Sequence, residues 1–154
     1  KAHPLHNKIV DIRISNGLIT AIKEQLTVEA TDTVVPLKGT SVSYGWFDPE
    51  VSFSQPGYEH KGLLVNDLNE AAQVGIASVG LMSYTLPHPD SGSALSFFKG
   101  FESHPVSLHP FGSLTHKNKG EELAELFDLF DQGALAFYDY KRPLLEPNLM
   151  KLAL

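Results

Sequence analysis

Residues 62–82 read GLLVNDLNEAAQVGIASVGLM, and this stretch decides the fold class. Its first part carries apolar residues at the spacing of one helix face, at Leu64, Leu68, Ala71 and Ala72. Gly75 then supplies a stop signal. The apolar run at 76–82 follows at once and predicts a short buried strand. The stretch therefore predicts a helix leading directly into a strand.

The same alternation continues on both sides. Residues 46–54 predict a preceding strand, and later residues predict a short helix at 94–101, a strand at 105–114, an amphipathic helix at 120–133, a strand at 134–139 and a helix from 146 with Pro147 in its first turn. The helix at 120–133 is expected to bury one face: Leu123, Leu126, Phe127 and Phe130. This order is typical of βα units on a parallel sheet. Both an open sheet and half of an eight-stranded barrel accommodate about four such units.

The residues before this pattern have only β character. Val10, Ile12 and Ile14 alternate with polar residues, Asn16-Gly17 supplies a tight turn, and residues 18–22 return, which together predict a hairpin. Residues 33–37 and 40–47 continue the β pattern. The chain therefore begins with a separate β module.

Composition narrows the class of function. The 154 residues include 12 Lys and Arg against 18 Asp and Glu, for a net charge of −6, which argues against nucleic acid as a partner. No apolar run reaches the ~20 residues of a membrane span. The absence of cysteine excludes disulfides and thiolate metal sites and is typical of a cytoplasmic protein. Any zinc would depend on histidine and carboxylates.

A row of polar residues marks a candidate site at the end of the first βα strand. Residues 45–62 read GWFDPEVSFSQPGYEHKG. Side chains alternate along a strand, so one face carries the polar set Asp48, Glu50, Ser52 and Ser54. We expect this row to form the floor of a former or present active site. Asp48 has a simpler interpretation, a hydrogen bond to backbone near the strand.

Several motifs in order resemble the dihydroorotases, which are cyclic amidohydrolases of pyrimidine synthesis. They are VDIRISNGLITAI, YGWFD, QPGYEHKG followed by AAQVGIASVGLM, and GEELAELFDLFDQGALAFYD. The resemblance implies an α/β fold, a partial TIM-like (β/α) barrel preceded by part of a small β-sandwich domain. Residues 1–47 would belong to the sandwich and 48–154 to the first half of the barrel. The opening without methionine and the incomplete barrel lead us to expect a longer intact protein.

The resemblance also implies a zinc site, but its residues are replaced here. The family's His-x-His falls on Glu50 and Ser52, its substrate-binding Arg on Ser54, and its substrate-binding Asn on Tyr84. The family has a later pair of aspartates, of which only Asp139 remains here. Which member of that pair bridges the metals stays open. We interpret Glu50, Ser52 and Asp139 as vestigial metal-ligand positions, and Ser54 and Tyr84 as vestigial substrate positions.

These replacements favour a non-catalytic homologue with no cofactor. A carboxylate that acts alone as a general base does not replace the activation of water by a metal. We expect a structural role in assembly, with a second copy or aspartate transcarbamoylase as partner. The alternative is an active dihydroorotase or related cyclic amidohydrolase. It would use either zinc held by Glu50, Asp139 and histidines beyond Leu154, or a metal-free route. A generic α/β binding module is a third possibility.

For several other residues the sequence allows both a structural and a functional interpretation. His88 and His109 are the histidines nearest to a remnant pocket, although surface or structural roles are the usual ones for such residues. Tyr84, Tyr138 and Tyr140 lead to a further hypothesis, that aromatic side chains fill the volume left by metal and substrate.

Overall fold

The computed structural model describes residues 3–154 and divides the chain after Val42 into two compact units, each described here by itself. The first unit is built on an antiparallel hairpin, in which β1 (Asp11–Ser15) pairs with β2 (Leu18–Lys23). Asn16 and Gly17 both have positive φ, as a two-residue hairpin turn requires. The predicted hairpin is confirmed.

The further strands expected in this part are not formed. Residues 33–37 and 40–45 are irregular, and Val34, Val35 and Leu37 are each more than 60% exposed. A strand needs a neighbour to take up its backbone hydrogen bonds, and no neighbouring strand is described for these residues. The prediction of strands from the β-rich composition of these residues is therefore wrong.

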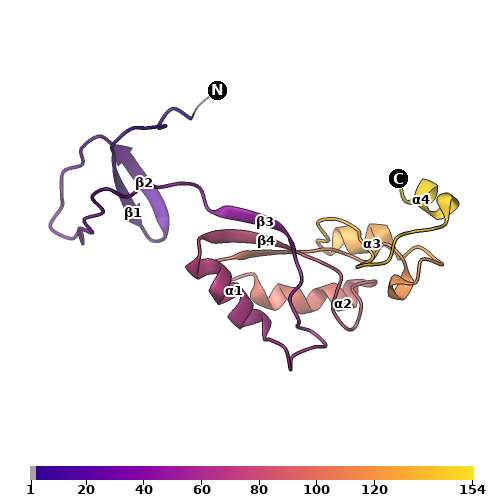
Figure 1. Ribbon diagram of the computed structural model, residues 1–154. Coiled ribbons are helices and arrows are strands. Elements are labelled where there is room, and N and C mark those ends of the chain that lie inside the picture. Colours follow the sequence, from indigo (N-terminus) through magenta and orange to yellow (C-terminus); the bar gives the residue numbers. More distant parts are fainter. Residues whose placement is uncertain (1–2) are drawn as a thin grey trace. The chain divides into compact units, whose positions relative to one another are not determined.

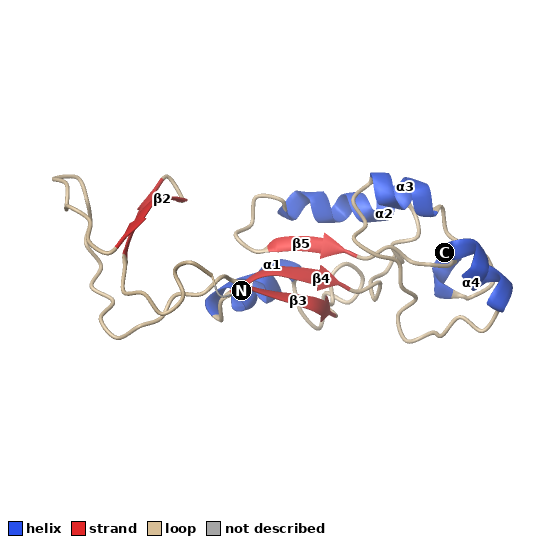
Figure 2. Ribbon diagram, turned by 90° about the horizontal axis from the view of Figure 1, so that it is seen from above, coloured by secondary structure: helices blue, strands red, loops and turns tan. Residues whose placement is uncertain are grey.

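The second unit is an α/β unit with a parallel sheet, as predicted. Its strands are β3 (Trp46–Val51), β4 (Ile76–Leu81) and β5 (Ser107–Pro110), which lie in the order β3-β4-β5 (Figure 2). Asp48 pairs with Val79, and Val79 pairs in turn with Leu108. All three strands therefore end at the same edge of the sheet, which is where parallel α/β proteins place their ligands.

Helices fill the two crossovers. The first is α1 (Leu64–Gln73), and the second combines α2 (Gly92–Ser96) with the 3₁₀ helix η1 (Phe97–Phe101); α1 and α2 lie on the same side of the sheet (Figure 1). The predicted helix 62–75 is confirmed, with Leu64, Leu68 and Ala71 buried and Ala72 exposed. The core between helices and sheet comprises chiefly Leu64, Leu68, Val79, Leu81, Leu95, Phe98, Val106 and Leu129.

The helix expected at 120–133 is shorter than its pattern indicates. Only α3 (Leu126–Asp131) is helical. The residues before it pair antiparallel with the chain after β5: Leu123 forms a bridge with Thr115, and the Ala124 amide donates to the Leu114 carbonyl at 3.0 Å. Because these backbone groups are already paired with another segment, they are not available for a helix.

The buried face of this helix was also assigned wrongly. Phe127 is 90% exposed and Phe130 is 66% exposed, whereas Leu129 is completely buried. Leu123 and Leu126 are only half-buried. A short helix that starts at Leu126 turns Leu129 towards the core, and the two phenylalanines face away.

The exposure of Phe127 leads to a stability prediction. We expect Phe127→Ala to change the free energy of unfolding by less than about 0.5 kcal/mol, as for other surface substitutions. A buried phenylalanine, as the sequence pattern indicated, would lose about 3–5 kcal/mol instead. Urea unfolding followed by circular dichroism distinguishes the two values.

The last predicted elements have different outcomes. Residues 134–139 form no named strand, although Phe137 makes one parallel bridge to Gly112, and the Tyr138 amide donates to the Gly112 carbonyl at 2.9 Å. The final helix is confirmed as α4 (Pro147–Ala153), with proline in its first turn. In the part of the chain that the structure describes, no helix has the length and apolar character needed to cross a bilayer.

Candidate functional site at the carboxyl edge of the sheet

The polar row lies where β3 ends. Glu50 is the penultimate residue of β3, and Ser52 and Ser54 follow it. Glu50 and Ser52 are exposed, whereas Val51 and Phe53 pack against the core, so the predicted alternation of faces holds over residues 50–53. Asp48 and Ser54 are half-buried, and the prediction that they share the exposed face is wrong. The interpretation of Asp48 as a backbone partner is confirmed, because its carboxylate accepts a hydrogen bond from the Glu50 amide at 3.1 Å.

Three tyrosines meet beside this row. Tyr84, just beyond β4, stacks on Tyr58 with ring centroids 4.8 Å apart and planes 10° from parallel. On its other side Tyr84 lies 4.9 Å from the ring of Tyr140, and the side chain of Ser52 lies near enough to the Tyr140 hydroxyl to lower its pKa. We call Tyr58, Tyr84 and Tyr140 the tyrosine cluster. Tyr84 is part of this cluster and Ser52 lies beside Tyr140. The cluster thus brings together two positions that the sequence assigned to one site.

Two lysines flank the tyrosine cluster. The Lys61 ammonium donates to the Tyr84 hydroxyl at 2.9 Å and lies 4.7 Å from the Tyr58 ring centroid. The Lys141 ammonium lies 5.1 Å from the Tyr140 ring centroid. Ammonium groups over tyrosine rings are attracted by the negative face of the ring.

The same contacts shift two pKa values. The hydrogen bond to the Tyr84 hydroxyl raises the pKa of Lys61 above its ordinary value. The hydrogen bonds with Ser52 and Lys141 lower the pKa of Tyr140. Each shift favours the ionised form of its own side chain.

The hypothesis that aromatic side chains fill the volume of metal and substrate stays a prediction. Tyr84 and Tyr140 contact each other, but Tyr138 remains 37% exposed. Tyr58 and Lys61 were missed by the sequence analysis. Their signal lay in QPGYEHKG, where an aromatic residue and a lysine occupy the turn directly after the polar strand.

Asp139 is buried and fully engaged by protein donors. It is 5% exposed, and its carboxylate accepts hydrogen bonds from the Leu114 and Thr115 amides, each at 2.9 Å, and from the Thr115 hydroxyl. Thr115 Oγ1 in turn accepts from the Gly120 amide at 2.8 Å. Asp139 therefore ties the segment after β5 to residues 137–139, and both of its oxygens are used.

These residues do not fit a zinc ion. A zinc site needs three or four nitrogen, sulfur or carboxylate ligands around one point. Across residues 3–154, no three His, Asp or Glu side chains lie together in such an arrangement. The Asp139 oxygens already accept hydrogen bonds from Leu114 and Thr115. We derive no chemical step through a metal in this segment.

The two candidate histidines have structural neighbours. His88 Nδ1 lies 3.4 Å from Asn118 Nδ2, and the His109 ring meets the Phe47 ring edge-on at 6.2 Å. A further polar pair was missed: His116 Nδ1 lies 2.9 Å from the Asp90 carboxylate, which also accepts from the Lys117 amide. The contacts of His88 and His116 join the loops that follow β4 and β5.

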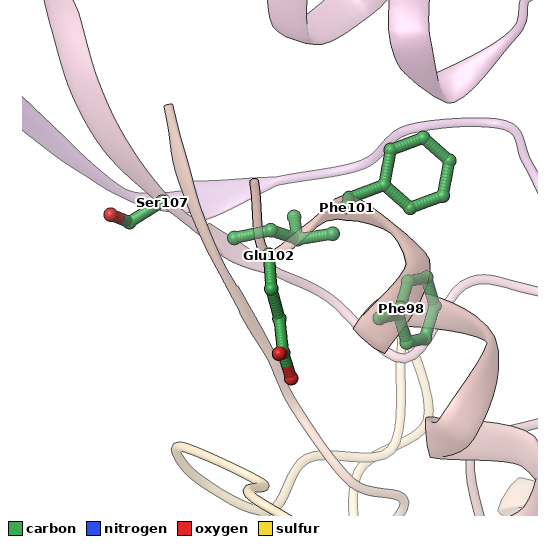
Figure 3. Close-up of a pocket in the computed structure, with 5 residues that line it drawn as sticks. Phe98, Phe101, Glu102 and Ser107 are labelled. Atoms are coloured by element: carbon green, nitrogen blue, oxygen red, sulfur yellow. The ribbon is translucent and has the colours of Figure 1, made fainter. Parts of the chain in front are cut away.

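A small hollow lies away from all these residues. It has a volume of about 200 Å³ and is lined by Phe98, Phe101, Glu102, Ser107 and Leu108 (Figure 3). Ser107 is the first residue of β5, so the hollow opens at the amino end of that strand. Parallel βα folds carry their catalytic residues at the other edge of the sheet, at the carboxyl ends of the strands. The hollow contains no predicted site residue.

A parallel sheet with helices in its crossovers and polar residues at the carboxyl ends of its strands defines an α/β protein, a class whose ligands commonly bind at that edge. No family model matches the chain. It is, however, 34% identical over 146 residues to the dihydroorotase of Pelotomaculum thermopropionicum, covering 94% of this chain and 34% of that protein. It is 34% identical over 150 residues to that of Geobacter sulfurreducens, covering 96% and 35%.

The dihydroorotase of Syntrophus aciditrophicus is 32% identical over 148 residues, covering 94% of this chain and 35% of that protein. The resemblance to the dihydroorotases is thereby confirmed: over nearly its whole length, the chain is homologous to them. It spans about a third of the length of the curated relatives it matches.

Proposed function

We propose that the chain belongs to a dihydroorotase-like protein of pyrimidine biosynthesis that does not hydrolyse a cyclic amide and acts structurally in assembly. The observation that carries the proposal is the replacement, at the strand ends, of the family's metal-binding and substrate-binding residues. Glu50 and Ser52 stand where the resembling family has two histidines, and Tyr84 stands where it has a substrate-binding asparagine. The tyrosine cluster lies across these positions.

The chemistry supports this proposal. Hydrolysis of a ring amide needs a water of lowered pKa, and a metal lowers the pKa of a bound water to about 7. A carboxylate base such as Glu50 contributes typically only ~10²–10⁴-fold. Ser54 offers a hydroxyl in place of a guanidinium fork, so a substrate carboxylate also loses its bidentate partner.

The wider architecture is part of the same proposal. Residues 48–154 would form the first half of a (β/α)8 barrel, and residues 1–47 part of a β-sandwich domain. The parallel order β3-β4-β5 with helices in both crossovers is compatible with a barrel wall. Assembly would involve a second copy or aspartate transcarbamoylase.

The activity is tested on the full-length protein. We expect no interconversion of carbamoyl aspartate and dihydroorotate above background, and zinc well below one equivalent per chain by plasma mass spectrometry. A dihydroorotase from one of the relatives, prepared in the same way, is the positive control. Turnover together with stoichiometric zinc would overturn the non-catalytic proposal in favour of an altered but working metal site.

The assembly role needs its own measurement. Light scattering coupled to gel filtration, with and without aspartate transcarbamoylase, reports the mass of any complex. A monomer that stays monomeric in both conditions would contradict the structural role, whatever the result of the assay.

A further inference from the structure

Residues 55–62, which we call the strap, connect β3 to α1 and are anchored at both ends. The Tyr58 amide donates to the Ser54 carbonyl at 2.9 Å, and the Lys61 amide donates to the Tyr58 carbonyl at 2.9 Å. At its start, the Gln55 side chain accepts from the Leu64 amide at 2.9 Å, so the strap is tied to the first turn of α1.

The strap is also fastened to the loop that follows β4. The Leu86 amide donates to the Pro56 carbonyl at 3.0 Å. The Tyr58 ring stacks on Tyr84, and the Lys61 ammonium binds the Tyr84 hydroxyl. A backbone bond, a ring stack and an ammonium contact thus join the same two loops, and they are chemically independent of one another.

The closeness of the two loops depends on a glycine. A Cβ atom built on Gly57 would lie 2.6 Å from both Cβ and the carbonyl oxygen of Leu86. The φ of Gly57 is +103°, a conformation that other residues rarely adopt. The strap is therefore shaped to lie against the β4 loop, and its contacts are more than a chance meeting of surface side chains.

We propose that the strap is a latch that closes the carboxyl edge of β3 and β4, and that the Lys61–Tyr84 contact is its fastening. Lys61 is exposed, so this fastening is the part that yields first when the edge opens. Opening the latch separates Tyr58 from Tyr84 and exposes Ser54, which is half-buried with the strap in place. This inference concerns access to the edge and holds whether or not the protein catalyses a reaction.

The latch is tested by amide hydrogen exchange in the full-length protein, with residues 54–62 and 83–90 read separately. In the wild type we expect protected amides at Tyr58, Lys61 and Leu86. Lys61→Met should speed their exchange about fivefold, the effect of losing one exposed cation–π contact. Tyr84→Leu, which also removes the ring stack, should speed it about tenfold or more.

Two further variants make the result decisive. Tyr84→Phe keeps the ring and loses only the hydroxyl, so its strap should exchange at a rate between the wild type and Tyr84→Leu. Lys99→Met is the matched control, because Lys99 is also an exposed lysine with one side-chain hydrogen bond, to Gln132 at 3.0 Å. Unprotected amides in the wild-type strap, or equal exchange in Lys61→Met and Lys99→Met, would overturn the latch. If Tyr84→Leu does not fold, the comparison of Lys61→Met, Tyr84→Phe and Lys99→Met still tests the proposal.

Discussion

Replacing Asp139 with alanine is expected to lower the free energy of unfolding by about 3–4 kcal/mol. The change removes an acceptor that serves the amides of Leu114 and Thr115 and the hydroxyl of Thr115, in a position only 5% exposed. Buried donors left without partners cost about 1–3 kcal/mol each, although the local structure relaxes in part. Urea unfolding of the protein, followed by circular dichroism, measures the loss.

A conservative variant separates the hydrogen bonds from the charge. Asp139→Asn keeps one oxygen for the two amides, both of which donate to Oδ1, and its new amide group can donate to Thr115 Oγ1. We therefore expect a loss of only about 1–2 kcal/mol. Asp131→Ala, an exposed aspartate in α3, is the control and should stay within about 0.5 kcal/mol. An alanine variant at Asp139 as stable as this control would show that the carboxylate has no structural role.

Gly57→Ala is the second substitution with a large expected effect, a loss of about 3 kcal/mol. Part of this is backbone strain, of order 1–3 kcal/mol, because φ is +103°. The rest arises because the new methyl group would overlap Leu86, whose backbone oxygen lies only 2.6 Å from the Cβ position. Main-chain atoms yield poorly, so the strap or the β4 loop must move. The measurement is again the urea midpoint.

Gly133 offers a closely matched control. Its φ is +99°, nearly that of Gly57, but a Cβ atom there would meet nothing within 4 Å. Gly133→Ala should therefore show the strain alone, about 1–2 kcal/mol. The difference between the two variants isolates the approach of strap and loop. Equal losses would mean that Leu86 moves aside at little cost, and the close contact would lose its importance.

Asp139 also bears on how the site is interpreted. From the sequence it was a vestige of a metal centre, and in the structure its carboxylate joins two segments near the carboxyl edge. These hydrogen bonds give Asp139 a structural role that does not depend on a metal. This supports the proposal that the scaffold is retained for something other than hydrolysis.

The sequence by itself determined the elements whose signals are local. The Asn16-Gly17 turn, the 62–75 helix and the following strand need only periodicity and a stop residue, and they were predicted at nearly their observed bounds. It also determined which residue types stand at Glu50, Ser52, Ser54 and Tyr84, on which the proposal of a non-catalytic protein rests. Side-chain chemistry is a property of the chain before it folds.

Only the tertiary structure decided where backbone and side chains found partners. Residues 122–124 pair with the chain after β5, so the predicted helix begins at Leu126, and Phe127 turns outward. Tyr58 and Lys61 reach Tyr84 because two loops distant in sequence meet at one edge of a parallel sheet. The physical reason is that hydrogen bonds and ring contacts are chosen among all groups brought together by folding, and a local pattern contains no record of those distant groups.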